Sequence, residues 1–191
     1  MSGLNSGLVL VIFLKIMRKV HIKIITILLI IPVEFFSQNI PFITEYVTDN
    51  AKMFSSTEKS KIDSLCKDIY GDTIAQIVVL TENDIPEEAK QYGDNLLLYA
   101  TDIANYNRIG RKGVDDGILI YIVKNEKKIS IANGYLIAEL VSDSTTSRII
   151  KKIIAPKFKV GKYSNGVIDG IEALKKEIVK RRKYIWPEKY R

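Results

Sequence analysis

The stretch GVDDGILIYIVKNEKKISIAN, residues 113–133, predicts two neighbouring strands joined by a short turn. Six consecutive apolar residues, Ile118–Val123, are typical of a central strand that is covered on both faces. The polar tetrapeptide KNEK follows, and after it KISIAN alternates polar and apolar side chains as a half-exposed strand does. We therefore predict a β-hairpin with Gly117 and two adjacent carboxylates, Asp115 and Asp116, at its entrance.

Helix and strand patterns alternate on the N-terminal side of this hairpin. Ser55 and Glu58 have the spacing of a capping box, which predicts a helix that begins there and ends at Gly71. The β-branched run Thr73–Leu80 predicts a buried strand. A short extended segment is expected before the helix, around Tyr46–Thr48.

Three further helices are predicted along the chain. One begins near Pro86 and keeps its helical spacing through Gly93. Another has Asp143 as its N-cap and ends at Pro156, and the last covers 164–181. Together these elements predict an α/β protein, a three-layer α/β/α sandwich with a mixed, mostly four-stranded sheet including one β-hairpin.

Residues 1–38 have the features of a secretory signal peptide. Basic residues precede an uncharged apolar run, Ile24–Val33, and the small residue Ser37 lies where cleavage is expected. Met17 is an alternative start of the chain. An uncleaved membrane anchor is the second interpretation, although the apolar run is shorter than the roughly 20 residues that a span needs. Both interpretations predict an exported chain in the periplasm or another extracytoplasmic compartment.

The remaining chain is expected to contain a linker at 39–45, one domain at 46–180 and a basic, aromatic tail at 181–191. The net charge of +7 comes from the two ends, because 39–174 holds 17 bases and 19 acids. A nearly neutral body argues against a nucleic-acid partner. The tail is interpreted either as a solvated helix end or as a contact for an anionic membrane surface or a membrane protein complex.

The counts of histidine and cysteine exclude several kinds of site. Cys66 is the only cysteine, so no internal disulfide forms, and its position on an apolar helical face predicts a buried thiol. His21 is the only histidine and belongs to the signal segment, which excludes histidine-dependent catalysis from the mature chain. The loop GRKGVDDG lacks the GK[ST] of a phosphate loop and precedes a strand, so no nucleotide is expected.

Acidic residues are expected to converge at one edge of the sheet. In a hairpin the start of the first strand lies beside the end of the second, so Asp115 and Asp116 should approach Glu139 and Asp143. Asp49 is expected to join them from the first connection between strand and helix. Carboxylates held together repel one another unless a cation compensates, and Ca²⁺ or another divalent ion with oxygen ligands is the usual solution.

Two other interpretations of these acids remain open from the residues alone. In the first, Asp115 and Asp116 are turn residues and Asp143 only caps a helix. In the second, two of the carboxylates form an acid and base pair. The spacing matches no EF-hand, which needs acids at alternate positions of a loop between two helices.

The order of the blocks IGRKGVDDGILIYIV, NGY…SD, RIIKKIIAPKF and GKYSNGV resembles the TPM domain family of thylakoid-lumen, photosystem-repair and receptor-modulator proteins. The resemblance extends from Tyr46 to near Lys180. Two departures from the family pattern are Leu136 in place of a glycine and Ala138 in place of a glutamate, with Glu139 one position later. The positions that match the family motifs are Asp49, Gly110, Asp116, Gly117, Gly134, Tyr135, Asp143, Arg148, Pro156, Phe158, Gly161 and Gly166.

The resemblance implies an α/β/α sandwich, a divalent cation near the acidic loops and work beside membrane protein complexes. The leading hypothesis is therefore an exported, calcium-binding accessory domain. Its expected metal ligands are Asp116 and Asp143, then Asp49 and Asp115, and last Glu139. Phosphatase activity has been proposed for some family members, so the alternative is a metal-dependent phosphatase in which Asp115 or Asp116 positions a catalytic water.

Overall fold

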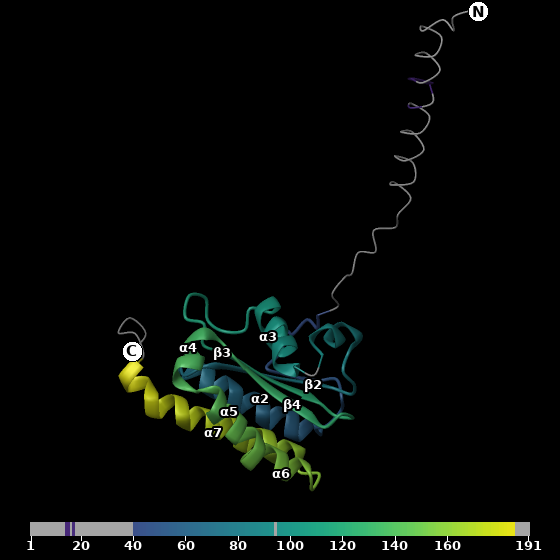
Figure 1. Cartoon of the computed structure of the whole chain (residues 1–191). Coiled ribbons are helices and arrows are strands. Elements are labelled where there is room, and N and C mark those ends of the chain that lie inside the picture. The colour runs from purple at the N-terminus through teal and green to yellow at the C-terminus, as the bar shows by residue number, and fades with distance from the viewer. Residues whose placement is uncertain (1–13, 16, 18–39, 94, 186–191) are drawn as a thin grey trace, which may run out of the picture. The chain divides into compact units, whose positions relative to one another are not determined.

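The computed structural model describes residues 14, 15, 17, 40–93 and 95–185 (Figure 1). The described residues from 40 onward belong to one compact unit, Asn39–Arg191. The apolar run and cleavage position of the predicted signal peptide, His21 and the last six residues of the predicted tail lie outside the described residues. Within the described part, no helix has the length and apolar character needed to cross a membrane.

A four-stranded mixed sheet lies at the centre of the domain (Figure 1). Its strands follow the order of the sequence: β1 (Val47–Asp49), β2 (Gln76–Glu82), β3 (Gly117–Val123) and β4 (Lys128–Asn133). The first three strands are parallel, and β4 is antiparallel to β3, with Ile120 opposite Ile131. The predicted hairpin is confirmed, and all seven residues of β3 are buried.

Helices cover both faces of this sheet, so the predicted three-layer architecture is confirmed. In Figure 1, α3 lies on one side of the sheet and α2 and α7 lie on the other. The helical elements are α2 (Ser56–Gly71), the 3-10 helix η1 (Glu87–Tyr92), α3 (Leu96–Tyr106), α4 (Tyr135–Leu140), α5 (Asp143–Ile149), the π-helix η2 (Ile150–Ile154), α6 (Ala155–Phe158) and α7 (Tyr163–Ile185).

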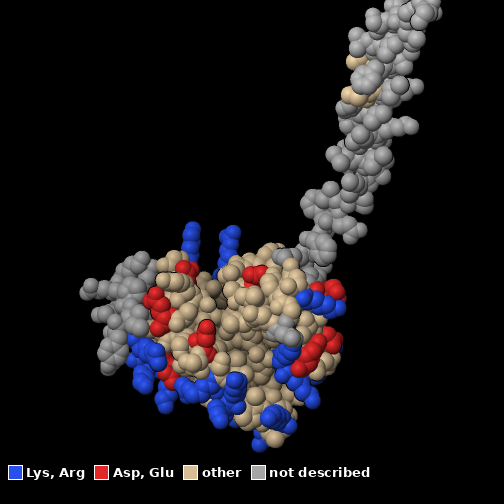
Figure 2. All heavy atoms as spheres, viewed as in Figure 1, with Lys and Arg blue, Asp and Glu red and all other residues tan. Residues whose placement is uncertain are grey.

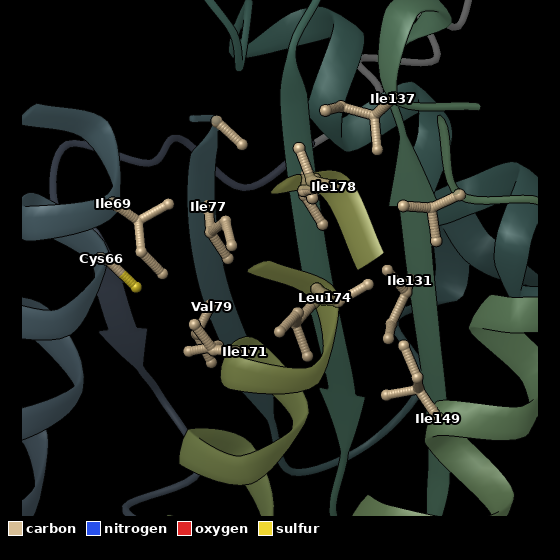
Figure 3. Packing of buried hydrophobic residues seen from close by; sticks show 14 of the residues in the cluster. Cys66, Ile69, Ile77, Val79, Ile131, Ile137, Ile149, Ile171, Leu174 and Ile178 are labelled. Carbon is tan, nitrogen blue, oxygen red and sulfur yellow. The ribbon is translucent and has the colours of Figure 1, made fainter. Parts of the chain in front are cut away.

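Alternate residues of the central strands supply the two halves of the core, as the two-residue period of a strand requires. Ile77 and Val79 of β2 contact the cluster that includes α2 and α7, whereas Val78 and Leu80 belong to the cluster with α3. Figure 3 shows side chains of α7 beside those of the strands and of α2. Cys66 is buried there, as predicted, and burial raises the pKa of its thiol to about 12, so the thiol stays protonated at neutral pH.

The two connections between parallel strands cross opposite faces of the sheet. The β1–β2 connection carries α2, and the β2–β3 connection carries α3. Both connections step in the same direction along the sheet, so they cannot share one hand. One of them is therefore left-handed, a rare arrangement for parallel strands. As a result, the chain leaves the carboxyl ends of β1 and β2 toward opposite faces.

The prediction of one continuous helix from Pro86 through Gly93 is wrong. The structure has a 3-10 helix that ends at Tyr92, and α3 begins only at Leu96. Gly93 lies between them with φ of 58°, a left-handed conformation that no right-handed helix contains. The apolar spacing across 89–103 persists because both pieces cover the same face of the sheet.

The predicted helix from Asp143 to Pro156 also needs correction at both ends. Ser142 is the N-cap, because its Oγ accepts a hydrogen bond from Thr145 N, and Asp143 is the first helical residue. Pro156 does not end the helix, which continues through the π-helix to Phe158. Pro156 is tolerated because it lies in the first turn of α6, where an N–H needs no partner within that helix. The preceding short helix α4 was not predicted.

The capping box at the start of α2 is confirmed and joins α2 to α7. Glu58 accepts hydrogen bonds from Ser55 N at 2.8 Å and from Ser164 Oγ of α7 at 2.5 Å. The Ser164 hydroxyl, followed by the groups of Ser55, lowers the pKa of Glu58 from 4.5 to about 2. The ionised carboxylate is therefore the form that the folded domain stabilises.

We expect Glu58→Gln to lower the melting temperature at pH 7 by roughly 2–4 °C, because the helix cap and the bond to Ser164 are weakened. The lowered pKa makes this contribution complete above pH 4.5 and removes it as the pH falls toward about 2. Melting curves of both proteins between pH 7 and pH 2 measure it. A difference that stays constant across this range would contradict the role of the Glu58 charge.

Candidate functional site

The loop before β3 crosses the start of the strand at very short range. A Cβ atom on Gly117 would lie 2.0 Å from Ile109 O, and one on Gly110 would lie 2.7 Å from Gly117 N. On the other side, Gly134 N donates to Gly117 O at 2.7 Å, and a Cβ there would lie 2.4 Å from Asp115 O. The expected approach of the DDG segment to the residues after β4 is therefore confirmed.

Asp116 is fully buried and forms an ion pair with Arg111. Its Oδ1 accepts a hydrogen bond from Arg111 N at 2.7 Å, and its Oδ2 accepts one from Arg111 Nε at 2.6 Å and another from Nη2. The same Nη2 also donates to Thr73 O at 2.8 Å. Both carboxylate oxygens are thus engaged by a cation from the chain itself.

Arg111 is the functional partner that the sequence prediction missed. It precedes Asp116 by five residues in a loop that contains Gly110 and Gly113, both with positive φ. Neither helical nor strand spacing applies across such a loop, so the pairing follows only from the folded backbone. The sequence indicated only that bases precede an acid at the start of a buried strand. This proximity does not tell whether Arg111 or Lys112 pairs with the acid.

Asp49 lies at the opposite edge of the sheet, so the expectation that it joins the other acids is wrong. β1 and β3 point the same way, but Asp49 ends β1 whereas Asp116 precedes β3. A strand of this length separates the two edges by roughly 20 Å. The Asp49 carboxylate accepts hydrogen bonds from Met53 N at 3.0 Å, Phe54 N at 2.9 Å and Thr81 Oγ1 at 2.5 Å. It holds the loop after β1.

The other three predicted ligands have exposed side chains. Asp115 has φ of 57° and lies in the turn before β3, Glu139 is on α4, and Asp143 is the first residue of α5. We call residues 111–116 and 133–143 the acidic edge. Within the described residues, no group of three or more acidic, histidine or cysteine side chains could hold a metal ion. The five predicted ligands therefore do not form one site.

One buried acceptor of the acidic edge has no hydrogen-bond partner among the described residues. The amide of Asn133, the last residue of β4, donates through Nδ2 to Val141 O at 3.3 Å and Thr146 Oγ1 at 3.2 Å. Its Oδ1 is buried and accepts no hydrogen bond. Asp143 belongs to the same turn that this amide contacts. Amide and carboxylate oxygens are both suitable ligands for Ca²⁺, but the Asn133 oxygen is buried whereas the Asp143 carboxylate is exposed, so this edge supplies the ligand types without one formed site.

A second feature lies at the carboxyl end of β3. A cavity of about 410 Å³ separates the β3–β4 turn from the connection between α6 and α7. Lys124, Lys127, Lys128 and Lys159 line it, and its lining contains no carboxylate. The sequence prediction missed this cavity because Lys159 is more than thirty residues away from the turn that it faces.

The sequence of this domain matches the model of a known family. The TPM domain model aligns with residues 47–177. The chain belongs to the TPM domain family. The close backbone approaches at Gly110, Gly117 and Gly134 give a physical reason for glycine at three motif positions of this TPM domain, because any Cβ there would overlap main-chain atoms.

Solved structures support the fold of this TPM domain. The N-terminal domain of a protein from P. gingivalis is 21% identical, with a TM-score of 0.63 over 76% of this chain and 88% of that domain. The BA42 protein from the psychrophilic bacterium Bizionia argentinensis is 20% identical, with a TM-score of 0.53 over 72% of this chain and 88% of its own.

A third solution structure, of the N-terminal domain of the cg2496 protein from Corynebacterium glutamicum, is 13% identical, with a TM-score of 0.53. It covers 71% of this chain and 80% of that domain. At these identities the comparison shows a shared fold only. No curated protein matches the chain.

Proposed function

We propose that this TPM domain is a non-catalytic binding module that takes up a divalent cation, Ca²⁺ in the first instance, at its acidic edge. In this role it presents cation-ordered loops to a membrane protein complex in an exported compartment. One observation carries the proposal: Asp116, the motif acid at the centre of this edge, is closed off by Arg111 and has no exposed surface. Asp116 therefore cannot reach a substrate or a catalytic water, which favours a binding role of the acidic edge over a catalytic role.

The phosphatase alternative requires an acid that touches metal or water. A general base or metal ligand must reach the water or the metal, but the Asp116 carboxylate is fully buried and its charge is balanced by Arg111. Asp49 is engaged in the same way by Met53, Phe54 and Thr81. Of the two acids named for catalysis, only Asp115 is exposed, and a single carboxylate does not hold a catalytic metal.

The exposed acids support weak cation binding. Asp143 supplies an exposed carboxylate in the turn that the Asn133 amide contacts, and Asp115 and Glu139 add negative charge at the same edge. Exposed carboxylates remain hydrated, so an ion bound there gains little from leaving water, and we expect millimolar affinity. Asp116 is omitted from the ligand set because it is buried and paired with Arg111, and Asp49 is omitted because it lies at the opposite edge of the sheet.

The proposed work beside a membrane rests on the ends of the chain. The signal-like segment 1–38 supports export, and the C-terminal part of α7 carries exposed Lys180 and Arg181 before the basic segment 186–191. Clustered bases of this kind favour anionic membrane surfaces. The acidic edge would then bind a cation, and this basic end would contact a membrane protein complex.

Melting curves of the 191-residue protein test the proposal. At ten times the dissociation constant, Ca²⁺ should raise the melting temperature by about 3–6 °C, and Asp143→Asn should abolish the rise. Glu172→Gln removes an equally exposed carboxylate from α7 and serves as the matched control. The same proteins should not hydrolyse a generic phosphate ester with Ca²⁺, Mg²⁺ or Mn²⁺. Turnover that is lost in Asp115→Asn would favour the phosphatase instead.

A further inference from the structure

The geometry points to a second binding site, the lysine-lined cavity at the carboxyl end of β3, and we propose that it binds a small amphipathic anion. The ligand class is an apolar chain or ring that carries one carboxylate or phosphate. The cavity lies at the edge of the sheet opposite the acidic edge, because β3 begins at one and ends at the other. The inference is therefore independent of cation binding.

Charge is the first observation that favours an anion. The β3–β4 turn contributes Lys124, Lys127 and Lys128, and Lys159 faces them from the segment after α6. Lys127 and Lys159 are exposed and form no ion pair with any described side chain. Like charges held around one cavity repel each other, and an anion between them removes this repulsion.

The surrounding surface reinforces this positive potential. Residues 144–168 carry six bases and no acid, and they comprise α5 after its first residue Asp143, η2, α6 and the start of α7. Figure 2 shows lysine and arginine side chains gathered along the lower rim of the domain, where α5, α6 and α7 lie in Figure 1. Of these bases, Lys157 pairs with Asp169 and Arg148 with Glu177. An anion would thus approach through a positive field.

The walls of the cavity determine the rest of the ligand. Ile122, Ile129, Met53 and Phe158 present apolar side chains to it, and the Phe158 ring meets the Tyr163 ring edge-on with centroids 5.2 Å apart. A small inorganic anion would make no contact with these apolar walls. A volume of about 410 Å³ lies within the range of small-molecule pockets. Apolar walls below a rim of lysines match an amphipathic anion.

Two hydrogen bonds hold the walls in place before a ligand arrives. Lys124 Nζ donates to Ala51 O at 3.0 Å, which fixes the β3–β4 turn to the loop after β1. Ala51 N donates to Thr81 Oγ1 at 3.1 Å and holds that loop against β2. The site is therefore largely formed in the free protein. It also lies where open α/β sheets commonly bind ligands, outside the carboxyl ends of parallel strands.

Calorimetric titration of the full chain at pH 7 with decanoate tests the inference. Decanoate should bind at low millimolar concentration, whereas decyl maltoside, which has the same chain without charge, and acetate, which has the charge without a chain, should not. The double variant Lys127→Asn/Lys159→Gln should bind decanoate about tenfold more weakly. Asparagine suits position 127 because the residue there has φ of 54°.

The matched control Lys61→Gln/Lys176→Gln removes the same charge from exposed positions of α2 and α7 that do not line the cavity, and it should leave decanoate binding unchanged. Vesicles of phosphatidylcholine with and without phosphatidylglycerol distinguish a lipid in a bilayer from a free amphiphile. Binding to the anionic vesicles that needs Lys127 and Lys159 assigns the lipid source. Equal binding of decanoate and decyl maltoside, equal affinity in the cavity variant, or no decanoate binding would overturn the inference.

Discussion

Replacing Asp116 by alanine is expected to destabilise the folded domain by about 3–5 kcal/mol, because the substitution leaves the Arg111 guanidinium without its counter-charge. The Asp116 side chain has no exposed surface, and that of Arg111 is only 23% exposed. The freed guanidinium keeps its hydrogen bond to Thr73 O. Urea unfolding at pH 7 measures the change. The loss should be the same with or without Ca²⁺, since the Arg111 side chain and not a metal ion balances the Asp116 charge.

Two controls separate the ion pair from other effects of the substitution. Asp115→Asn changes the neighbouring, exposed acid and should alter stability by less than about 0.5 kcal/mol. The double variant Arg111→Met/Asp116→Leu should be closer in stability to the natural protein than Asp116→Ala is, because neither charge is then left unpaired. If Asp116→Ala were as stable as Asp115→Asn, the ion pair would not stabilise the fold. If a Ca²⁺-induced rise in melting temperature were lost in Asp116→Ala but kept in Asp143→Asn, Asp116 would be a metal ligand and not only a structural acid.

The second large effect is expected at Gly117. An alanine Cβ would lie 2.0 Å from Ile109 O and 2.9 Å from Gly110 N, both main-chain atoms that cannot move without displacing the loop. We expect Gly117→Ala to cost about 3 kcal/mol or more and to disturb the amide signals of the loop before β3. Denaturant unfolding together with an amide NMR spectrum measures both effects.

Gly71→Ala is the matched control for this substitution. Gly71 ends α2, and a Cβ there would meet no atom within 4 Å. Alanine at this position should be neutral or slightly stabilising, because it reduces the freedom of the unfolded chain. A Gly117→Ala protein with natural stability and unchanged loop signals would show that the loop does not cross the strand as closely as described.

The sequence predicted the architecture well because local patterns dominate it. The uninterrupted apolar run of β3, the alternation in β4 and the capping box at Ser55 each depend on neighbours within a few residues. The errors arose where an isolated residue competes with a longer pattern. Gly93 interrupts the helix although the apolar spacing continues across it, and Pro156 lies in the first turn of α6, directly after a π-helix. Neither outcome follows from spacing alone.

The candidate site was predicted less completely, for a different reason. Hairpin geometry correctly brought Asp115 to Gly134, because strand pairing is set by the turn. The direction of β1 relative to β3 is a property of the whole sheet, so the sequence did not indicate that Asp49 lies at the far edge. The Arg111 pair and the lysine cavity depend on loops that meet only after folding, and they carry no periodic pattern.

Amide NMR of the 191-residue protein during a Ca²⁺ titration tests the central claim, that the acidic edge binds a cation through exposed acids while Asp116 stays paired with Arg111. We expect shifts in the fast-exchange regime, concentrated at 133–143 and around Asp115, that disappear in Asp143→Asn and saturate at millimolar Ca²⁺. Absence of any shift, or tight binding centred on Asp116 with release of the Arg111 side chain, would contradict it.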